Sequence, residues 1–346
     1  MYGAAVLRSL QEVRSFAVNG EKISVIVPAY NIAPWLARSL DSLLAQTHEN
    51  LEILVVDDGS SDETPDVLAD YAARYLNIRA IYKENGGVTS ARLRGVEEAT
   101  GDWIAFMDGD DVVEPQMYAR LLENALVHGA DISHCGHQIL YPDERIEYVH
   151  KSGDLFIQDH VTGLQDLLDN RKVSLSLCTK LYRRKLFAGL RDWMDPTIQN
   201  NEDFMMNYYL FDRAEKSVFE GVCPYHYLLR KGSASYRGIT EHYIFDPIRV
   251  RQTILQRCED TMKDAVQEAL LRYLLFDYAQ LDVHPDRKNL TDYRNRVRNL
   301  LLQQQEHFRL LSVRNKALAL MICKAPWMFR LAYGAYVAVF QREEQH

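Results

Sequence analysis

The sequence lacks several features that mark common classes of protein. Its five cysteines are widely spaced, and no C-x-x-C pair occurs that could begin a zinc site or a redox pair. We therefore expect reduced cysteines in the core of a cytosolic protein. The basic residues form no long block in the first two thirds of the chain, and the formal net charge is -8. This charge balance disfavours a nucleic-acid-binding surface.

Long uncharged hydrophobic runs are also missing. Residues 1–22 contain neither a long apolar centre nor a small-residue cleavage pattern, so we interpret them as a lead-in rather than a signal peptide. In the most apolar stretch, residues 317–340, Lys324, Pro326 and Arg330 interrupt the run that a membrane span needs. A core helix pair and a helix lying in the membrane interface remain as alternatives there. We expect a cytoplasmic protein, with peripheral contact at the inner face of the plasma membrane as a hypothesis.

Strand-like and helix-like segments alternate through the first half of the chain. Apolar, β-branched runs that predict strands lie at residues 23–30, 51–59, 78–85, 102–111 and 130–141. A segment with helical spacing follows each of the first four runs. This alternation is typical of a parallel α/β sheet with helices on both faces. After residue 154 we expect shorter helices. The predicted organisation is a lead-in at 1–22, an α/β domain at 23–240 and a helical region at 241–346.

Polar residues gather where the expected strands end, and the carboxyl edge of such a sheet is where ligands bind. The strongest example is "MDGDD", in which Asp108, Asp110 and Asp111 would repel one another unless a cation or hydrogen bonds neutralise them. Gly109 permits a sharp bend, so that the first two carboxylates can face one cavity. Oxygen ligands without His or Cys suit Mg²⁺ or Mn²⁺ shared with a phosphorylated substrate. A solvated acidic cap on the next helix is the alternative.

Three further clusters of polar residues stand out. Two of them follow expected strands at the same edge of the sheet, and the third lies later in the chain. Asp57 and Asp58 could form an acidic pocket, a metal site or an acceptor for nucleobase N–H groups, and their spacing does not choose among these. "NGGVTSARLRG" brings glycines and Arg92 to the edge, but it is neither a G-x-G-x-x-G fingerprint nor a Walker motif with its lysine. Glu202 and Asp203 begin a predicted helix, where capping is the default role of carboxylates.

Taken together, these motifs resemble a known family. "SVIVPAYN", "ILVVDDGSSDET", "ENGGVTSARLRG", "FMDGDD" and "NEDFMMN" occur in the order and approximate spacing of glycosyltransferase family 2, the nucleotide-diphospho-sugar transferases of the GT-A fold. The likeness covers roughly the first two thirds of the chain. "CTKLYRRKLF" is similar to a segment of bacterial members that build capsule, exopolysaccharide or lipopolysaccharide. The resemblance implies a GT-A fold, an α/β class with a Rossmann-like, mostly parallel sheet, ahead of the C-terminal helical subdomain.

The resemblance also implies contacts with the donor. The residues concerned are Pro28, Ala29, Tyr30, Asp58, Asn85, Gly86 and Arg92. The first three would line the nucleotide end, and Asp58 would accept a hydrogen bond from the uracil ring. The last three would lie along the donor sugar and diphosphate.

The remaining implied roles concern catalysis. Asp108 and Asp110 match the D-x-D pair of the family, with Asp110 as the direct ligand of Mn²⁺ or Mg²⁺ and Asp108 as a partner of the ribose or the metal. Glu202 and Asp203 match its E-D pair, with Asp203 as the base. These residue types suit the chemistry, since inverting transfer needs a base for the acceptor hydroxyl and a cation for the departing diphosphate.

The expected function is an inverting, metal-dependent transfer of a sugar from a UDP-sugar to a saccharide, expected to be lipid-linked, in the synthesis of a bacterial surface polysaccharide. The Q-x-x-R-W signature of processive synthases is absent, which favours one sugar per encounter. A sugar-nucleotide nucleotidyltransferase is one alternative, although the Gly-rich loop with Arg and Lys that usually follows its first strand is replaced by "PAYNIAPW". A non-catalytic nucleotide-binding module of the same fold is the other.

Overall fold

The computed structural model describes residues 20–170, 172–230 and 238–340, with side chains in the last helix described as far as residue 334. The expected lead-in at residues 1–22 therefore lies almost entirely outside the described residues.

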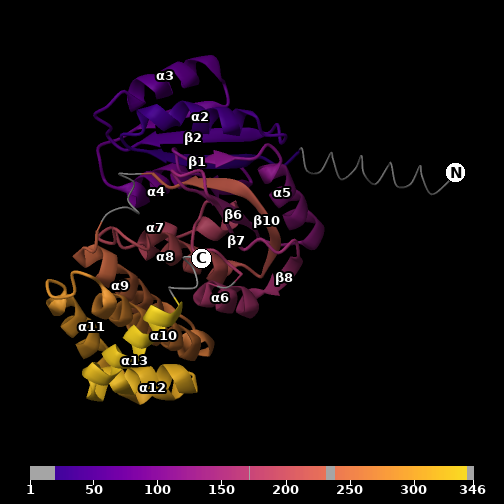
Figure 1. Ribbon diagram of the computed structural model, residues 1–346. Coiled ribbons are helices and arrows are strands. Elements are labelled where there is room, and N and C mark those ends of the chain that lie inside the picture. The colour runs from indigo at the N-terminus through magenta and orange to yellow at the C-terminus, as the bar shows by residue number, and fades with distance from the viewer. Residues whose placement is uncertain (1–19, 171, 231–237, 341–346) are drawn as a thin grey trace. The chain divides into compact units, whose positions relative to one another are not determined.

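Two compact units divide the chain after Arg237 (Figure 1). The boundary had been expected near residue 240. All five cysteines are buried and free, as their spacing predicts.

A ten-stranded sheet forms the centre of the first unit, in the order β3-β2-β1-β4-β9-β6-β10-β5, with β7 paired to β6 and β8 paired to β10. The strands are β1 (Ile23–Ala29), β2 (Leu51–Asp57), β3 (Ile78–Tyr82), β4 (Trp103–Phe106), β5 (Val112–Val113), β6 (Ile132–Leu140), β7 (Ile146–Val149), β8 (Leu155–Asp159), β9 (Lys180–Arg183) and β10 (Lys216–Leu228). The five strands expected from the first half of the sequence are confirmed.

The parallel part of the sheet positions the polar strand ends. β1 pairs in parallel with both β2 and β4, and β2 pairs in parallel with β3. Every residue of β2 and all but one of β1 are buried, because helices cover both faces and the β-branched runs meet no solvent. Ala29 lies opposite Asp57 in the register. The chain therefore leaves β1, β2 and β4 at one edge, where Asp58 and Asp108 follow.

The region after residue 154 contains the shorter helices expected there, including His160–Asp169 and Leu190–Trp193. It also supplies three strands, β8, β9 and β10, and β10 is 13 residues long. The strand signal of β10 is weak in the sequence because its register shifts between Glu220 and Tyr225, across a stretch with Gly221 and Pro224. Glycine and proline inside a strand mark such irregularities.

Helices of the first unit are α2 (Ala33–Leu44), α3 (Thr64–Arg74), α4 (Val88–Glu98), α5 (Met117–His128), α6 (His160–Asp169), α7 (Leu190–Trp193) and α8 (Glu202–Arg213). α4 packs on β1 and β2. A Cβ on Gly95 of α4 would lie 2.3 Å from Ile26 of β1. Glycine at this position therefore lets the helix approach the sheet closely, and the same helix carries Arg92.

The second unit is helical among its described residues. Its α-helices are α9 (Glu241–Arg257), α10 (Lys263–Val283), α11 (Thr291–Gln303), α12 (Val313–Lys324) and α13 (Pro326–Phe340). α10 packs against the other four and contributes Leu271 and Leu274 to the core. In the part of the chain that the structure describes, no helix combines the length and apolar character needed to cross a bilayer.

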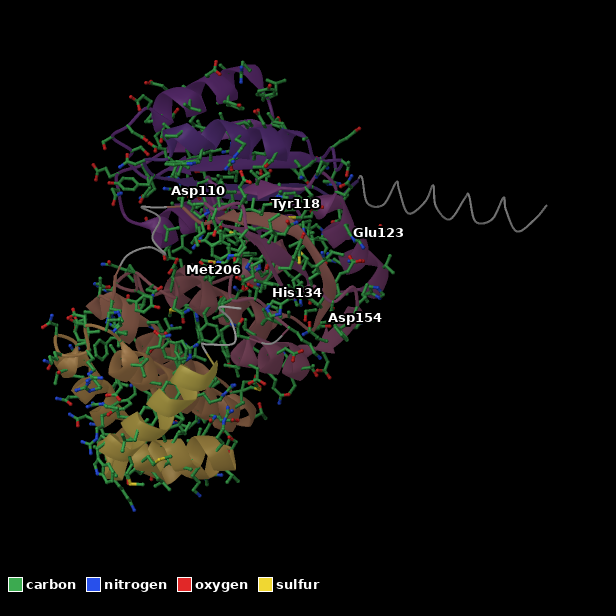
Figure 2. All side chains as sticks on the ribbon, in the orientation of Figure 1. Asp110, Tyr118, Glu123, His134, Asp154 and Met206 are labelled. Carbon is green, nitrogen blue, oxygen red and sulfur yellow. The ribbon has the colours of Figure 1, made fainter. Side chains whose placement is uncertain are left out.

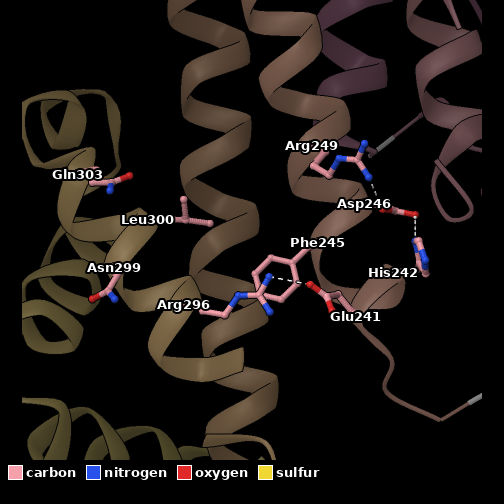
Figure 3. A pocket seen from close by; sticks show the side chains of 9 residues that line it. All are labelled: Glu241, His242, Phe245, Asp246, Arg249, Arg296, Asn299, Leu300 and Gln303. Carbon is pink, nitrogen blue, oxygen red and sulfur yellow. Dashed lines mark hydrogen bonds and ion pairs between the residues drawn. The ribbon is translucent and has the colours of Figure 1, made fainter. Parts of the chain in front are cut away.

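An open pocket of about 500 Å³ lies in the helical unit (Figure 3). Residues of α9 and α11 line it, and its acidic and basic side chains form pairs within the pocket. Arg296 donates to Glu241 at 2.8 Å and stacks on Phe245. Asp246 pairs with both Arg249 and His242.

Candidate functional site

The polar residues expected at the sheet edge come together in the first unit. Asp108 follows β4, and Figure 2 marks Asp110 on the segment that continues to β5. Arg92 comes from the second turn of α4, while Glu202 and Asp203 are the first two residues of α8. Three separate segments of the chain thus meet in one cluster. We call it the acidic cluster, and it consists of Asp108, Glu202 and Asp203 around Arg92.

Arg92 joins the members of this cluster. One terminal nitrogen donates to Glu202 at 3.2 Å and to Asp203 at 2.5 Å, and the other donates to Asp108 at 3.0 Å. Burial alone would lower the pKa of Arg92, but the three carboxylates raise it well above its ordinary value. The side chain is only 3% exposed. The resemblance placed Arg92 along the donor, whereas its guanidinium is directed here at the E-D pair and the D-x-D motif.

The acids of the E-D pair carry more negative charge than Arg92 can balance. Burial raises the pKa of Glu202 to about 7, and repulsion from Asp203 adds to the shift. Burial also raises the pKa of Asp203, against the lowering effect of Arg92. Asp203 in addition accepts the backbone N–H of Leu177 at 3.3 Å. Glu202 is therefore poised to exchange a proton near neutral pH.

Asp110 meets a second arginine. Arg230, two residues beyond β10, donates from Nε and Nη2 to Asp110 Oδ2 at 2.9 and 2.6 Å. The same guanidinium lies 3.9 Å from the ring centre of Trp35. Burial and the charge of Asp108 raise the pKa of Asp110, and Arg230 opposes that shift. Neither Trp35 nor this pairing could be predicted from the motif, because Asp110 and Arg230 lie 120 positions apart in the chain.

The third acid of "DGDD" has a structural role. Asp111 is 1% exposed and accepts the Tyr225 hydroxyl at 2.5 Å and the Leu228 backbone N–H at 2.9 Å. Burial and the neighbouring acids raise its pKa well above the ordinary value. These bonds tie the loop after β4 to β10, so Asp108 and Asp110 are presented from a fixed loop.

The donor set of Asp108 and Asp110 suits a hard divalent cation. Each carboxylate meets its arginine through one oxygen, so that the second oxygen can still face a cation. No group of three or more His, Cys, Asp or Glu side chains forms a metal-binding cluster among the described residues. Mg²⁺ typically takes one or two protein carboxylates and completes its shell with water and substrate phosphates. The two aspartates could thus hold such an ion together with a diphosphate.

At the expected nucleotide end, Asp58 organises the loop after β3. Its buried carboxylate accepts Lys83 at 2.5 Å and the backbone N–H groups of Gly86 and Gly87 at 3.0 and 2.7 Å. The Asn85 side chain donates to the Asp58 carbonyl at 2.9 Å. A carboxylate offers about four acceptor positions, so one position is left for a nucleobase.

The three residues expected beside the nucleotide differ in exposure. Ala29 is 2% exposed and Pro28 is half-buried, whereas Tyr30 is 51% exposed. Tyr30 therefore presents its ring at the carboxyl end of β1, where a planar base could stack on it.

A cavity of about 450 Å³ opens beside the acidic cluster, and both Asp108 and Asp203 line it. Its wall also includes Ser174 and Ser176. Lys180 is fully buried and fastens this wall by donating to the carbonyls of Ser174 and Ser176 at 2.7 and 2.5 Å. Burial lowers the pKa of Lys180 to about 7. The only sequence signal for this lysine was its place in "CTKLYRRKLF".

Comparisons with known proteins identify the family to which this sequence is similar. Residues 24–191 match the family model described as "Glycosyl transferase family 2". "Glycosyltransferase GlyA" of Streptococcus pneumoniae is 31% identical over 245 residues, which is 68% of this chain but 35% of GlyA. "Uncharacterized glycosyltransferase EpsJ" of Bacillus subtilis is 36% identical over 59% of this chain and 60% of EpsJ. The chain thus spans less than two thirds of the length of both relatives.

Solved structures extend the likeness to most of the fold. The crystal structure of TarS 1-349 from S. aureus matches with a TM-score of 0.72 at 18% identity, over 91% of each chain. A second TarS 1-349 structure, in complex with UDP-GlcNAc, matches with a TM-score of 0.72 at 19% identity. The TarS matches, together with the mostly parallel sheet and its flanking helices, show the GT-A fold. The family-model match and the similarity to GlyA and EpsJ show that the chain belongs to glycosyltransferase family 2.

Proposed function

We propose that the protein is an inverting, non-processive and metal-dependent glycosyltransferase. It moves a sugar from a UDP-sugar to a saccharide acceptor in the synthesis of a bacterial capsule, exopolysaccharide or lipopolysaccharide. The observation that carries this proposal is the bridge through Arg92, which keeps Asp203 beside Asp108. Family membership argues against the nucleotidyltransferase alternative, and measured transfer would exclude a non-catalytic module.

Asp203 acts as the base in this proposal. It lines the cavity next to Asp108, whereas Glu202 is not among the lining residues. As an acceptor hydroxyl attacks the anomeric carbon of the donor, Asp203 takes the hydroxyl proton while the bond to the UDP oxygen breaks. Attack from the face opposite the leaving diphosphate inverts the anomeric configuration. Positioned general-base catalysis typically contributes about 10²–10⁴-fold to the rate.

Asp108 and Asp110 would hold Mn²⁺ or Mg²⁺. When bound, such an ion supplies positive charge for the departing diphosphate. The uridine preference is supported by the TarS complexes with UDP and UDP-GlcNAc. In this chain, Tyr30 would stack on the base and Asp58 would accept its N–H.

Calorimetric titration tests the nucleotide and metal parts of the proposal. Purified protein is titrated with UDP with and without Mn²⁺, and with GDP and ADP as controls. We expect UDP to bind only with metal, and Asp110→Asn to weaken that binding by at least about tenfold, a change of about 1.4 kcal/mol. Glu241→Gln in the helical unit is the matched control and should bind UDP as the wild type does. Metal-independent binding, or none, would contradict the proposal.

We further propose that the acceptor is lipid-linked and that the helical unit contacts an anionic membrane surface. Trp327 and Leu331 of α13 are 64% and 68% exposed. Residues 311–334 contain four basic and no acidic side chains, Arg314, Lys316, Lys324 and Arg330. Exposed aromatic and apolar side chains beside basic ones favour binding at an interface. Flotation with vesicles containing phosphatidylglycerol tests this contact, and the double variant W327S/L331S should remain at the bottom of the gradient.

A further inference from the structure

We infer that the acceptor is an uncharged saccharide, which binds in the cavity between Asp203 and the wall fastened by Lys180. This inference rests on the proposed transfer reaction and specifies its acceptor class. Acceptors that carry a carboxylate or phosphate on the reacting sugar are excluded by the charge of the site.

The cavity has the size and chemistry of a small-ligand site. Its volume of about 450 Å³ lies within the range of about 300–1,000 Å³ that such sites usually have. Apolar and aromatic surface comes from Val149, Leu175, Tyr225 and Tyr227. Serine and asparagine side chains add hydroxyl and amide groups. Aromatic faces together with neutral hydrogen-bonding groups match the apolar faces and the hydroxyls of a sugar ring.

The charge around the cavity is negative. Asp108, Asp111 and Asp203 line it, whereas the described lining residues include no lysine or arginine. Two cations lie behind the walls, and both are engaged. Arg92 is 3% exposed and pairs with three carboxylates. Lys180 is fully buried and donates to backbone carbonyls. An anionic group on the acceptor would therefore meet Asp108 and Asp203, and no lysine or arginine among the described lining residues faces it.

His137 does not change this balance. His137 and His150 line the cavity. Burial lowers the pKa of His137 to about 4, so its ring is neutral at physiological pH and can exchange hydrogen bonds with hydroxyl groups. Like charges placed together in a binding site repel one another and weaken binding. Discrimination against an anionic acceptor is the expected consequence.

Matched pairs of sugars that differ in one charge test the inference. The pairs are methyl β-glucoside with methyl β-glucuronide, methyl β-galactoside with methyl β-galacturonide, and N-acetylglucosamine with its 6-phosphate. Binding to the wild-type protein saturated with UDP and Mg²⁺ is measured by saturation-transfer NMR. Transfer from UDP-glucose, UDP-galactose and UDP-GlcNAc is measured alongside. We expect the neutral member of each pair that binds to do so at least about tenfold more tightly.

A substitution in the wall sharpens the test. Val149 lines the cavity with a half-buried side chain, and Val149→Lys adds a cation without removing a side-chain hydrogen bond. In this variant, the affinity for the acidic member of a pair should rise about tenfold relative to the affinity for the neutral member. Val149→Leu changes the size of the side chain but not its charge, so it should leave the ratio of these two affinities unchanged.

The outcomes separate this inference from the proposed function. Equal or tighter binding of the acidic members overturns the inference, and if transfer still occurs the proposed function stands. Binding of no sugar by a protein that binds UDP normally overturns the assignment of the cavity but leaves the donor site in place. Failure to bind UDP with metal removes the proposed function itself. If Val149→Lys fails to fold, the binding of the matched sugar pairs to the wild-type protein still decides between these outcomes.

Discussion

The pocket of the helical unit and the acidic cluster of the first unit contain acidic and basic side chains in different proportions. In the helical pocket each acid meets its own base, with Glu241 paired to Arg296 and Asp246 paired to Arg249 and His242. In the first unit, Asp108, Glu202 and Asp203 share the single guanidinium of Arg92. The same residue types thus build a balanced pocket in one unit and an acidic excess in the other.

This difference indicates where function lies. Acids that already have their own basic partners need no ligand to balance them, which fits a structural role for the helical pocket. Buried carboxylates in excess are costly, and the raised pKa values of Glu202, Asp203 and Asp110 reflect that cost. Such groups persist at sites where a bound cation or a proton transfer uses them. Equivalent substitutions in the acidic cluster and in the helical pocket can therefore test this contrast.

The largest expected effect follows the removal of one negative charge from each region. Asp203→Asn should lower the rate of sugar transfer by about 10²–10⁴-fold, because the amide cannot take the acceptor proton. UDP affinity should remain nearly unchanged. Glu241→Gln in the helical pocket should alter neither quantity. Initial rates and calorimetry measure both, and a transfer rate for Asp203→Asn within a few fold of the wild type would remove Asp203 from its proposed role.

Replacing the arginine of each region compares their contributions to stability. Arg92→Met leaves three carboxylates without their shared partner, and breaking a buried ion pair in this way costs about 3–5 kcal/mol. Arg296→Met removes one exposed partner of Glu241 and should cost less than about 1 kcal/mol. Urea denaturation followed by circular dichroism gives both values. Similar losses for the two variants would show that Arg92 does not balance the acidic cluster.

Much of the acidic region could be predicted from the sequence, because strand ends and glycines are local signals. The buried β-branched runs identify β1, β2 and β4, and their parallel pairing brings Asp58 and Asp108 to one edge. Asp110 was identified from the crowded carboxylates of "MDGDD", whereas the role of Asp203 was implied by motif likeness. The pairings of these acids could not be predicted, since Arg92 and Asp203 are 111 positions apart. Only the folded chain determines which acid an arginine meets.

The later part of the domain was harder to predict for a different reason. β10 contains an irregularity at Gly221 to Pro224, which interrupts the strand pattern. This strand nevertheless carries Tyr225, which holds Asp111, and leads directly to Arg230. The missed strand therefore also concealed the pairing of Arg230 with Asp110. Residue periodicity identifies regular elements better than it identifies interrupted ones.

A smaller effect is expected at Asp110, where Arg230 and a divalent cation would use the same carboxylate. Arg230→Gln removes the competing positive charge, so affinity for Mn²⁺ without nucleotide should rise by about tenfold, a change of about 1.4 kcal/mol. Electron paramagnetic resonance of free Mn²⁺ measures this affinity independently of activity. Arg249→Gln in the helical pocket is the control and should leave it unchanged. An equal or weaker affinity for Arg230→Gln would show that the guanidinium does not compete with the ion.

The smallest expected effect concerns an acid of the helical unit that departs from the balanced pattern. Asp277 on α10 is 1% exposed, and its Oδ2 has no hydrogen-bond partner among the described residues. Burial raises its pKa to about 8, although Arg251 opposes the shift. Because the folded-state pKa lies above the unfolded value of about 3.9, its contribution to stability is complete below about pH 4 and is lost as the pH rises to about 8. Asp277→Asn should remove this dependence, so that melting temperatures measured from pH 5 to pH 9 diverge and increasingly favour the variant as the pH rises to about 8. Parallel curves for the two proteins would show that Asp277 does not take up a proton on folding.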